Sequence, residues 1–139
     1  MTAFVLDSSV ALSWFFDDEQ SDAADRLLDQ LATETAAVPA LWYFEMVNVL
    51  AISERRRRTT AARVAEFVTR LSDLDLDVDR EPDACVFGAV LTLARSERLS
   101  GYDAAYLELA MRLGLPLATK DEALAGAAER LGVTVLWGR

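Results

Sequence analysis

The chain has 139 residues, of which 53% are apolar and 27% are charged, and its formal net charge is −9. This apolar content excludes a disordered chain, and no apolar run approaches the roughly 20 residues that span a bilayer. With one cysteine and no histidine, the chain has no intrachain disulfide, no thiolate zinc cluster and no histidine-dependent nucleophile.

The first residues lack the basic start of a signal peptide, and acidic residues at positions 7 and 17–19 would interrupt the apolar region of such a peptide. We therefore expect a single cytoplasmic domain, residues 1–139, that does not associate with a membrane.

Short apolar strands alternate with amphipathic helices along the chain. In order, the pattern predicts a strand at 4–6, helices at 8–16 and 22–31, a strand at 36–38, helices at 41–54 and 59–71, a strand at 74–78, helices at 82–98 and 100–113, a strand at 115–119, a helix at 121–131 and a strand at 133–136. Pro82 suits a first helical turn, and Gly114 and Gly132 suit helix ends. Such alternation predicts an α/β domain with a mainly parallel central sheet.

Four carboxylates lie where a site is expected. Asp7 and Asp121 each follow a predicted strand, Asp103 lies near the start of a helix, and Glu45 lies inside an apolar helix. Sites in parallel sheets form at the carboxyl ends of strands. A cluster of acids without bases favours a hard divalent cation, Mg²⁺ or Mn²⁺.

Each aspartate also has a purely structural interpretation. Asp7 suits the N-cap of the next helix, and Asp103 suits the third position of a capping box opened by Ser100. Thr119 would open another box, with Asp121 favoured in its first turn by the helix dipole.

Glu45 has no capping role in the middle of its helix. Asn48, three residues later, is the one polar neighbour on the same face, so its amide is expected to orient the carboxylate. The alternative is a buried ion pair between Glu45 and an arginine from another element.

The run Arg55, Arg56, Arg57 and Arg58 is the one strongly basic segment. Its simplest interpretation is a solvated turn between two helices, and the alternatives are an RNA phosphate contact or a partner surface. Aromatic residues at 14–16 and 42–44 are expected mostly in the core, with some at a dimer interface.

Four segments together resemble the motifs of PIN-domain proteins. They are residues 6–12 (LDSSVAL), residues 38–42 (VPALW) followed by Glu45 and Asn48, residues 99–107 (LSGYDAAYL) and residues 115–124 (LPLATKDEAL). The resemblance runs in order along almost the whole chain. It implies a PIN-like three-layer α/β/α domain.

The compact chain is most similar to VapC toxins of type II toxin–antitoxin systems. The resemblance implies an endoribonuclease that uses Mg²⁺ or Mn²⁺, cuts tRNA or ribosomal RNA, forms a homodimer and is held inactive by a VapB-type antitoxin. The family's catalytic and metal-site acids correspond to Asp7, Glu45, Asp103 and Asp121, and its supporting polar residues correspond to Ser9 and Asn48.

Charge considerations suggest a division of roles among the acids. Asp7 and Asp103 are expected to bind the ion directly, and Glu45 and Asp121 to bind a second ion or hold water. The alternatives are a non-toxin PIN-domain RNA-processing nuclease and a catalytically silent PIN-like scaffold. A receiver domain of the response-regulator type does not fit, because the acid after the first strand is single and Glu45 has no place in that scheme.

Overall fold

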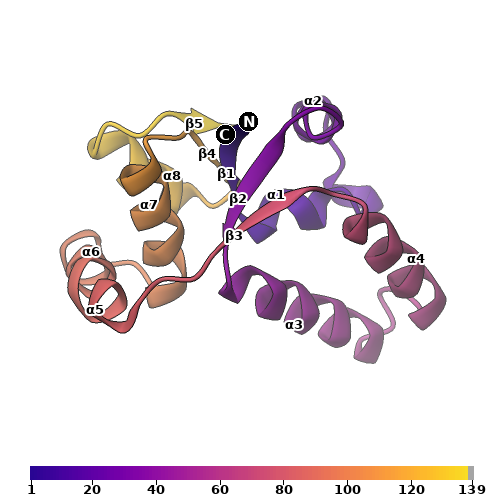
Figure 1. Ribbon diagram of the computed structural model, residues 1–139. Helices are drawn as coiled ribbons and strands as arrows, with labels where there is room; N and C mark the ends of the chain where they lie inside the picture. Colours follow the sequence, from indigo (N-terminus) through magenta and orange to yellow (C-terminus); the bar gives the residue numbers. More distant parts are fainter. Residues whose placement is uncertain (138–139) are drawn as a thin grey trace.

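A five-stranded parallel sheet forms the centre of the molecule (Figure 1). The computed structural model describes residues 1–137. The strands lie in the order β3-β2-β1-β4-β5 and all neighbouring pairs are parallel. Their bounds are β1 (Thr2–Leu6), β2 (Thr35–Pro39), β3 (Leu76–Asp79), β4 (Leu117–Ala118) and β5 (Val135–Leu136).

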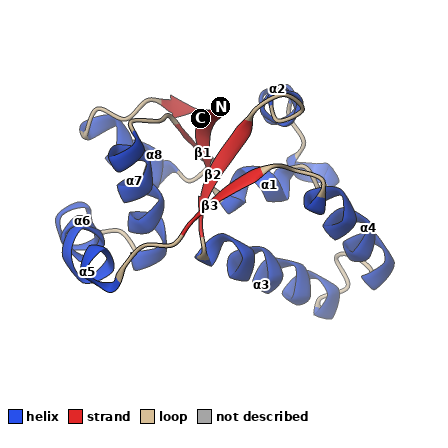
Figure 2. Ribbon diagram, in the orientation of Figure 1, coloured by secondary structure: helices blue, strands red, loops and turns tan. Residues whose placement is uncertain are grey.

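Helices cover both faces of this sheet (Figures 1 and 2). One face carries α1 (Ser8–Ser13), α2 (Asp22–Gln30), α3 (Leu41–Arg55) and α4 (Ala61–Ser72), together with the 3₁₀ turn η1 (Asp17–Glu19). The other face carries α5 (Asp83–Cys85), the π-helical turn η2 (Val86–Val90), α6 (Leu91–Glu97), α7 (Gly101–Leu113) and α8 (Glu122–Arg130). The predicted three-layer α/β/α architecture with a parallel sheet is confirmed.

The core lies around β1, the middle strand. Phe4, Val5 and Leu6 are completely buried because helices cover both faces of this strand. Trp42 from α3 and Tyr106 and Leu107 from α7 are the largest buried side chains from the two helical layers. The carboxyl end of β1, where Asp7 follows, is therefore held by packing on both sides.

The strand predicted at 115–119 is reduced to Leu117–Ala118. The Leu115 N–H donates to the Ala110 carbonyl and so completes the end of α7. Pro116 has no N–H to donate to the ladder. Thr119 has already left the sheet, which frees its side chain to turn toward Asp7.

The predicted helix at 82–98 is divided. Pro82 occupies the N-cap of α5 rather than a position inside the first turn, and η2 interrupts regular α-helical bonding before α6. Arg98 ends α6 in the left-handed region, with φ of 55°. The remaining elements agree with the predictions to within a few residues, except that the first helix ends at Ser13, three residues before the predicted boundary.

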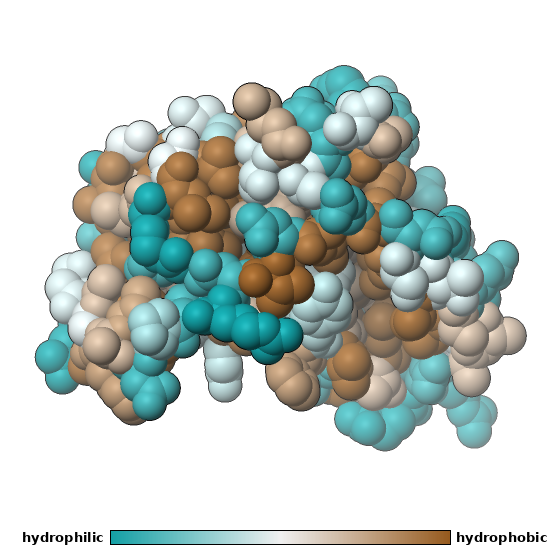
Figure 3. All heavy atoms as spheres, in the orientation of Figure 1, coloured by the Kyte–Doolittle hydropathy of each residue, from teal (hydrophilic) through white to brown (hydrophobic). Residues whose placement is uncertain are grey.

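The aromatic residues at 42–44, expected mostly in the core, are divided between the core and the surface. Phe44 of α3 is 76% exposed, and Tyr43 and Val47 are also exposed, whereas Trp42 is buried. Apolar side chains accordingly reach the surface over α3 and α4 (Figure 3). Within residues 1–137, no helix combines the length and apolar character needed to cross a membrane.

Candidate active site

Asp7 is the most buried of the four predicted acids, with 4% of its surface exposed. Its backbone N–H donates to the Ala118 carbonyl at 3.0 Å, which continues the pairing of β1 with β4. Its Oδ2 accepts hydrogen bonds from the hydroxyls of Ser9 and Thr119, both at 2.7 Å. Asp7 occupies the N-cap position of α1, but its carboxylate makes no capping bond within the described residues. The hydroxyls of Ser9 and Thr119 orient this carboxylate.

Glu45 lies half-buried on α3 and faces α7. Its Oε1 accepts hydrogen bonds from the hydroxyls of Tyr106 at 2.5 Å and Ser8 at 3.2 Å. None of the ion pairs formed within residues 1–137 includes Glu45, so the buried-arginine interpretation is not what the structure shows. Asn48 is exposed and lines the same cleft, and its expected support of Glu45 stays a prediction.

Asp103 lies in the first turn of α7, and Asp121 lies at the start of α8. The Ser100 hydroxyl accepts from the Asp103 N–H at 3.1 Å, which is the expected half of a capping box. The capping prediction for Thr119 is wrong, because Asp121 itself caps α8 by accepting from the Leu124 N–H at 2.9 Å. Thr119 instead accepts from the Asp121 N–H at 3.0 Å while it donates to Asp7.

The four acids lie within electrostatic reach of one another. Burial, followed by the charges of Asp121, Asp7 and Glu45, raises the pKa of Asp103 from 3.8 to about 6. The pKa of Asp7 is raised mainly by burial, with a contribution from Asp121, and that of Glu45 by burial and by Asp7. The fold therefore brings all four carboxylates into one negatively charged region.

The chemistry of these donors fits a hard divalent cation, since all four are carboxylates and their repulsion would be relieved by positive charge. The side chains do not form a ready-made cage: among residues 1–137, no three acids are arranged so that they could hold one ion. Metal binding by Asp7, Glu45, Asp103 and Asp121 stays a prediction.

A cleft of about 530 Å³ opens beside Glu45. Its lining combines polar side chains with aromatic rings and two aliphatic side chains, namely Ser8, Leu41, Phe44, Glu45, Asn48, Val49 and Tyr102. Such a lining offers both hydrogen-bonding groups and ring surfaces to a ligand at the acids.

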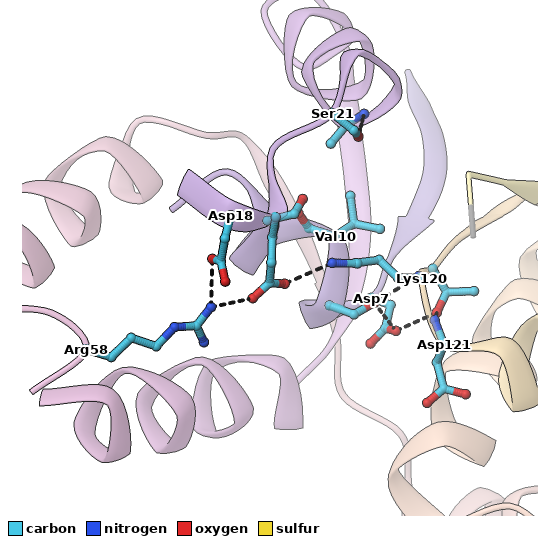
Figure 4. Close-up of polar contacts among 12 residues, drawn as sticks. Asp7, Val10, Asp18, Ser21, Arg58, Lys120 and Asp121 are labelled. Carbon is cyan, nitrogen blue, oxygen red and sulfur yellow. Dashed lines mark hydrogen bonds and ion pairs between the residues drawn. The ribbon is translucent and has the colours of Figure 1, made fainter. Parts of the chain in front are cut away.

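The basic run forms the predicted turn between α3 and α4. Arg55 ends α3, and Arg56 and Arg57 are exposed in the turn. Arg58 differs, because its guanidinium donates to Asp18 at 2.9 Å and to Glu19 at 3.0 Å. Figure 4 shows these bonds continuing to Lys120, whose Nζ donates to Glu19 at 2.9 Å.

Three hydroxyl residues of the site are not identified as site residues by the sequence. The pattern assigns Thr119 to a helix cap and gives no role to Ser8 or Tyr106. The available signal is position: Tyr106 follows Asp103 by three residues and so shares its helix face, and Ser8 adjoins Asp7.

Stability of the metal-free protein is expected to fall as the pH rises from about 4 to about 6. The pKa of Asp103 is raised in the folded state, so the folded protein binds this proton more tightly than the unfolded chain does, and ionisation favours unfolding. The pKa values of Asp7 and Glu45 are also raised in the folded state, so ionisation of these two acids likewise favours unfolding. Melting temperatures in EDTA across this pH range should show the slope. Asp103→Asn should make this slope of melting temperature against pH shallower, whereas the control Asp29→Asn, at an exposed position, should leave it unchanged.

Comparison with known proteins gives one family and a shared fold. The PIN domain family model matches residues 4–130. The chain superposes on the crystal structure of PAE2754 from Pyrobaculum aerophilum with a TM-score of 0.72 and 24% identity, covering 97% of this chain and 91% of that one. For FitAcB from Neisseria gonorrhoeae the TM-score is 0.65 and the identity 19%, covering 97% of each chain. No curated protein matches.

Proposed function

Because the chain belongs to the PIN domain family, whose members are typically metal-dependent nucleases, we propose that it is an endoribonuclease dependent on Mg²⁺ or Mn²⁺. We further propose that it is the VapC-type toxin of a type II toxin–antitoxin module. The carrying observation is the convergence of Asp7, Glu45, Asp103 and Asp121, one of which lines an open cleft, with the pKa of Asp103 raised by burial and by the charges of the other three acids.

Each acid has a role in this proposal. Asp7 and Asp103 would hold a divalent ion directly, and Glu45 and Asp121 would hold a second ion or orient water. Such an ion, when bound, lowers the pKa of water and neutralises charge that builds on a phosphate. The reaction is the in-line hydrolysis of an RNA phosphodiester.

The chain's own residues prepare this chemistry. Ser9 and Thr119 fix the orientation of Asp7, and Tyr106 and Ser8 fix that of Glu45. With no histidine in the chain, a proton released during hydrolysis passes to a carboxylate or to bulk solvent.

The proposed partners are those that the resemblance to VapC toxins implies. The substrate is tRNA or ribosomal RNA in the cytoplasm. A cavity of about 420 Å³ between α3 and α4, lined mostly by apolar side chains such as Tyr43, Met46, Val47 and Val68, offers a surface for a VapB-type antitoxin. The exposed face of α3 could also serve the expected homodimer.

Incubation of the purified protein with labelled tRNA and ribosomal RNA tests the proposed activity. We expect discrete cleavage products with Mg²⁺ or Mn²⁺ and none with EDTA. Growth arrest on expression, relieved by co-expression of a cognate VapB-type antitoxin, separates a toxin from a non-toxin RNA-processing nuclease. Products that form equally well in EDTA would exclude the metal mechanism, and the absence of products would favour a silent scaffold.

A further inference from the structure

The short turn η1 consists of three acids, and each is paired with a cation from another element. The pairs are Asp17–Arg63 at 3.7 Å, Asp18–Arg58 at 2.9 Å, Glu19–Arg58 at 3.0 Å and Glu19–Lys120 at 2.9 Å. Glu19 is the centre of this group, because its two oxygens contact different cations. The cations come from the turn after α3, from α4 and from the loop after β4.

Lys120 connects this group to the candidate active site. It lies between Thr119 and Asp121 in the chain, and its backbone N–H donates to the Ser9 hydroxyl at 3.1 Å. The same hydroxyl donates to Asp7. The backbone of Lys120 is therefore held at the acid site, while its side chain reaches away to Glu19 (Figure 4).

Arg58 is held in place by more than its ion pairs. Its guanidinium carbon lies 3.7 Å from the centre of the Phe16 ring, and the ring itself is buried. This stacking fixes the guanidinium without engaging all its N–H groups. Arg58 and Lys120 are thus two positioned cations that share one carboxylate at the edge of the acid site.

Glu19 is replaceable in this arrangement. Its side chain and those of Arg58 and Lys120 are all partly exposed, and ion pairs in contact with water contribute little to stability. A phosphate oxygen is an acceptor of the same charge and similar size. An RNA strand that contacts these cations also gains from counterion release, which a carboxylate of the same chain does not provide.

We infer that Arg58 and Lys120 form a contact site for the phosphodiester backbone of the RNA substrate, and that Glu19 occupies this site in the free protein. The inference rests on the proposed function, which it deepens by assigning residues to RNA binding. It also accounts for an RNA-binding protein with a net charge of −9, because the required cations are present beside the acids but are neutralised until RNA arrives. Arg63, paired with Asp17, extends the site.

Glu19→Gln separates this inference from a purely structural role for the ion pairs. Affinity for a fluorescein-labelled single-stranded RNA is measured in EDTA, where cleavage does not occur, over a series of salt concentrations. Glu66→Gln on α4 is the matched control, because it removes one negative charge from an exposed glutamate that forms no ion pair with Arg58 or Lys120 within residues 1–137.

Glu19→Gln is expected to bind RNA about three- to tenfold more tightly than Glu66→Gln. The slope of the logarithm of RNA affinity against the logarithm of salt concentration should become steeper by about 0.7 for each cation released. Lys120→Gln should weaken binding, and the gain from Glu19→Gln should be largely lost in the Lys120→Gln background. Equal affinities for Glu19→Gln and Glu66→Gln, or weaker binding by Glu19→Gln, would overturn the inference. Melting temperatures of all variants identify any loss of fold.

Cleavage of a dinucleotide with Mn²⁺ distinguishes failure of the inference from failure of the proposed function. A dinucleotide is too short to depend on the outer cations. Cleavage without any dependence of RNA affinity on Glu19 overturns the inference alone. Increased RNA affinity of Glu19→Gln without any cleavage supports the inference and contradicts the nuclease assignment. A protein that neither binds nor cleaves RNA contradicts both.

Discussion

Asp7→Asn is expected to lower metal-dependent RNA cleavage by more than roughly 100-fold, because it removes a charged ligand from the proposed metal site. Asp103→Asn should have a similar effect. Both changes preserve the shape of the side chain, and an asparagine oxygen can still accept from Ser9 or Thr119 at position 7. Loss of repulsion among the acids should raise the melting temperature of the metal-free Asp103→Asn variant.

Initial cleavage rates with Mn²⁺ and melting temperatures in EDTA measure these two effects separately. Asp29→Asn on α2 is the matched control, because it makes the same chemical change at an exposed position. Parental cleavage rates in both active-site variants would show that the site has been assigned to the wrong residues. Loss of activity together with loss of fold would assign Asp7 a structural role instead.

Arg112→Ala is expected to lower the free energy of unfolding by about 2 kcal/mol. Arg112 on α7 donates to Glu108 at 2.8 Å and to Asp79, the last residue of β3, at 2.7 Å. Glu108 is only 6% exposed, so removing its partner leaves a buried charge uncompensated. The Arg112 side chain is itself 39% exposed, and water screening keeps the loss below the roughly 3–5 kcal/mol of a fully buried pair.

Urea unfolding at pH 7 provides the measurement, with Arg26→Ala on α2 as the exposed control. Glu108→Gln in the Arg112→Ala background should recover part of the lost stability, because the uncompensated charge is then gone. If the single and double variants unfold at the same urea concentration, the buried charge is not the cause. The effect would then come from lost packing of the Arg112 stem on α7.

The exposed face of α3 shows why hydrophobicity alone does not identify the core. Phe44 and Val47 are as apolar as Trp42, and the sequence offers no local reason for their different burial. What decides is which face of α3 packs against β2 and α1: its buried side chains, Trp42, Met46, Leu50 and Ser53, share one helix face, and the choice of that face depends on contacts between distant segments. The same contacts determine which apolar side chains remain available to a partner.

Local order along the chain is sufficient to predict the architecture. Apolar runs such as residues 4–6, alternating with amphipathic helices, predict a parallel α/β sheet because parallel strands require helical crossovers. The placement of Asp7 and Asp121 after strands predicts their meeting, since parallel strands share one carboxyl edge. These inferences succeed because they depend on short-range periodicity and on the direction of the strands.

Side-chain partners were decided only by the tertiary structure. Thr119 and Asp7 are 112 positions apart in the chain, and Tyr106 and Glu45 are 61 apart, so no local pattern relates them. Thr119 is of a residue type that often caps helices, yet its hydroxyl donates to Asp7 because β4 ends just before it. Asp121 occupies the N-cap of α8 instead. Arg58 likewise belongs to a basic run by sequence, but the approach of η1 gives it carboxylate partners that its three neighbours lack among the described residues. Sequence determined which charges the protein carries and at which strand ends they lie, because those depend on neighbouring residues. Their neutralisation, orientation and exposure depend on contacts between distant segments, which only folding creates.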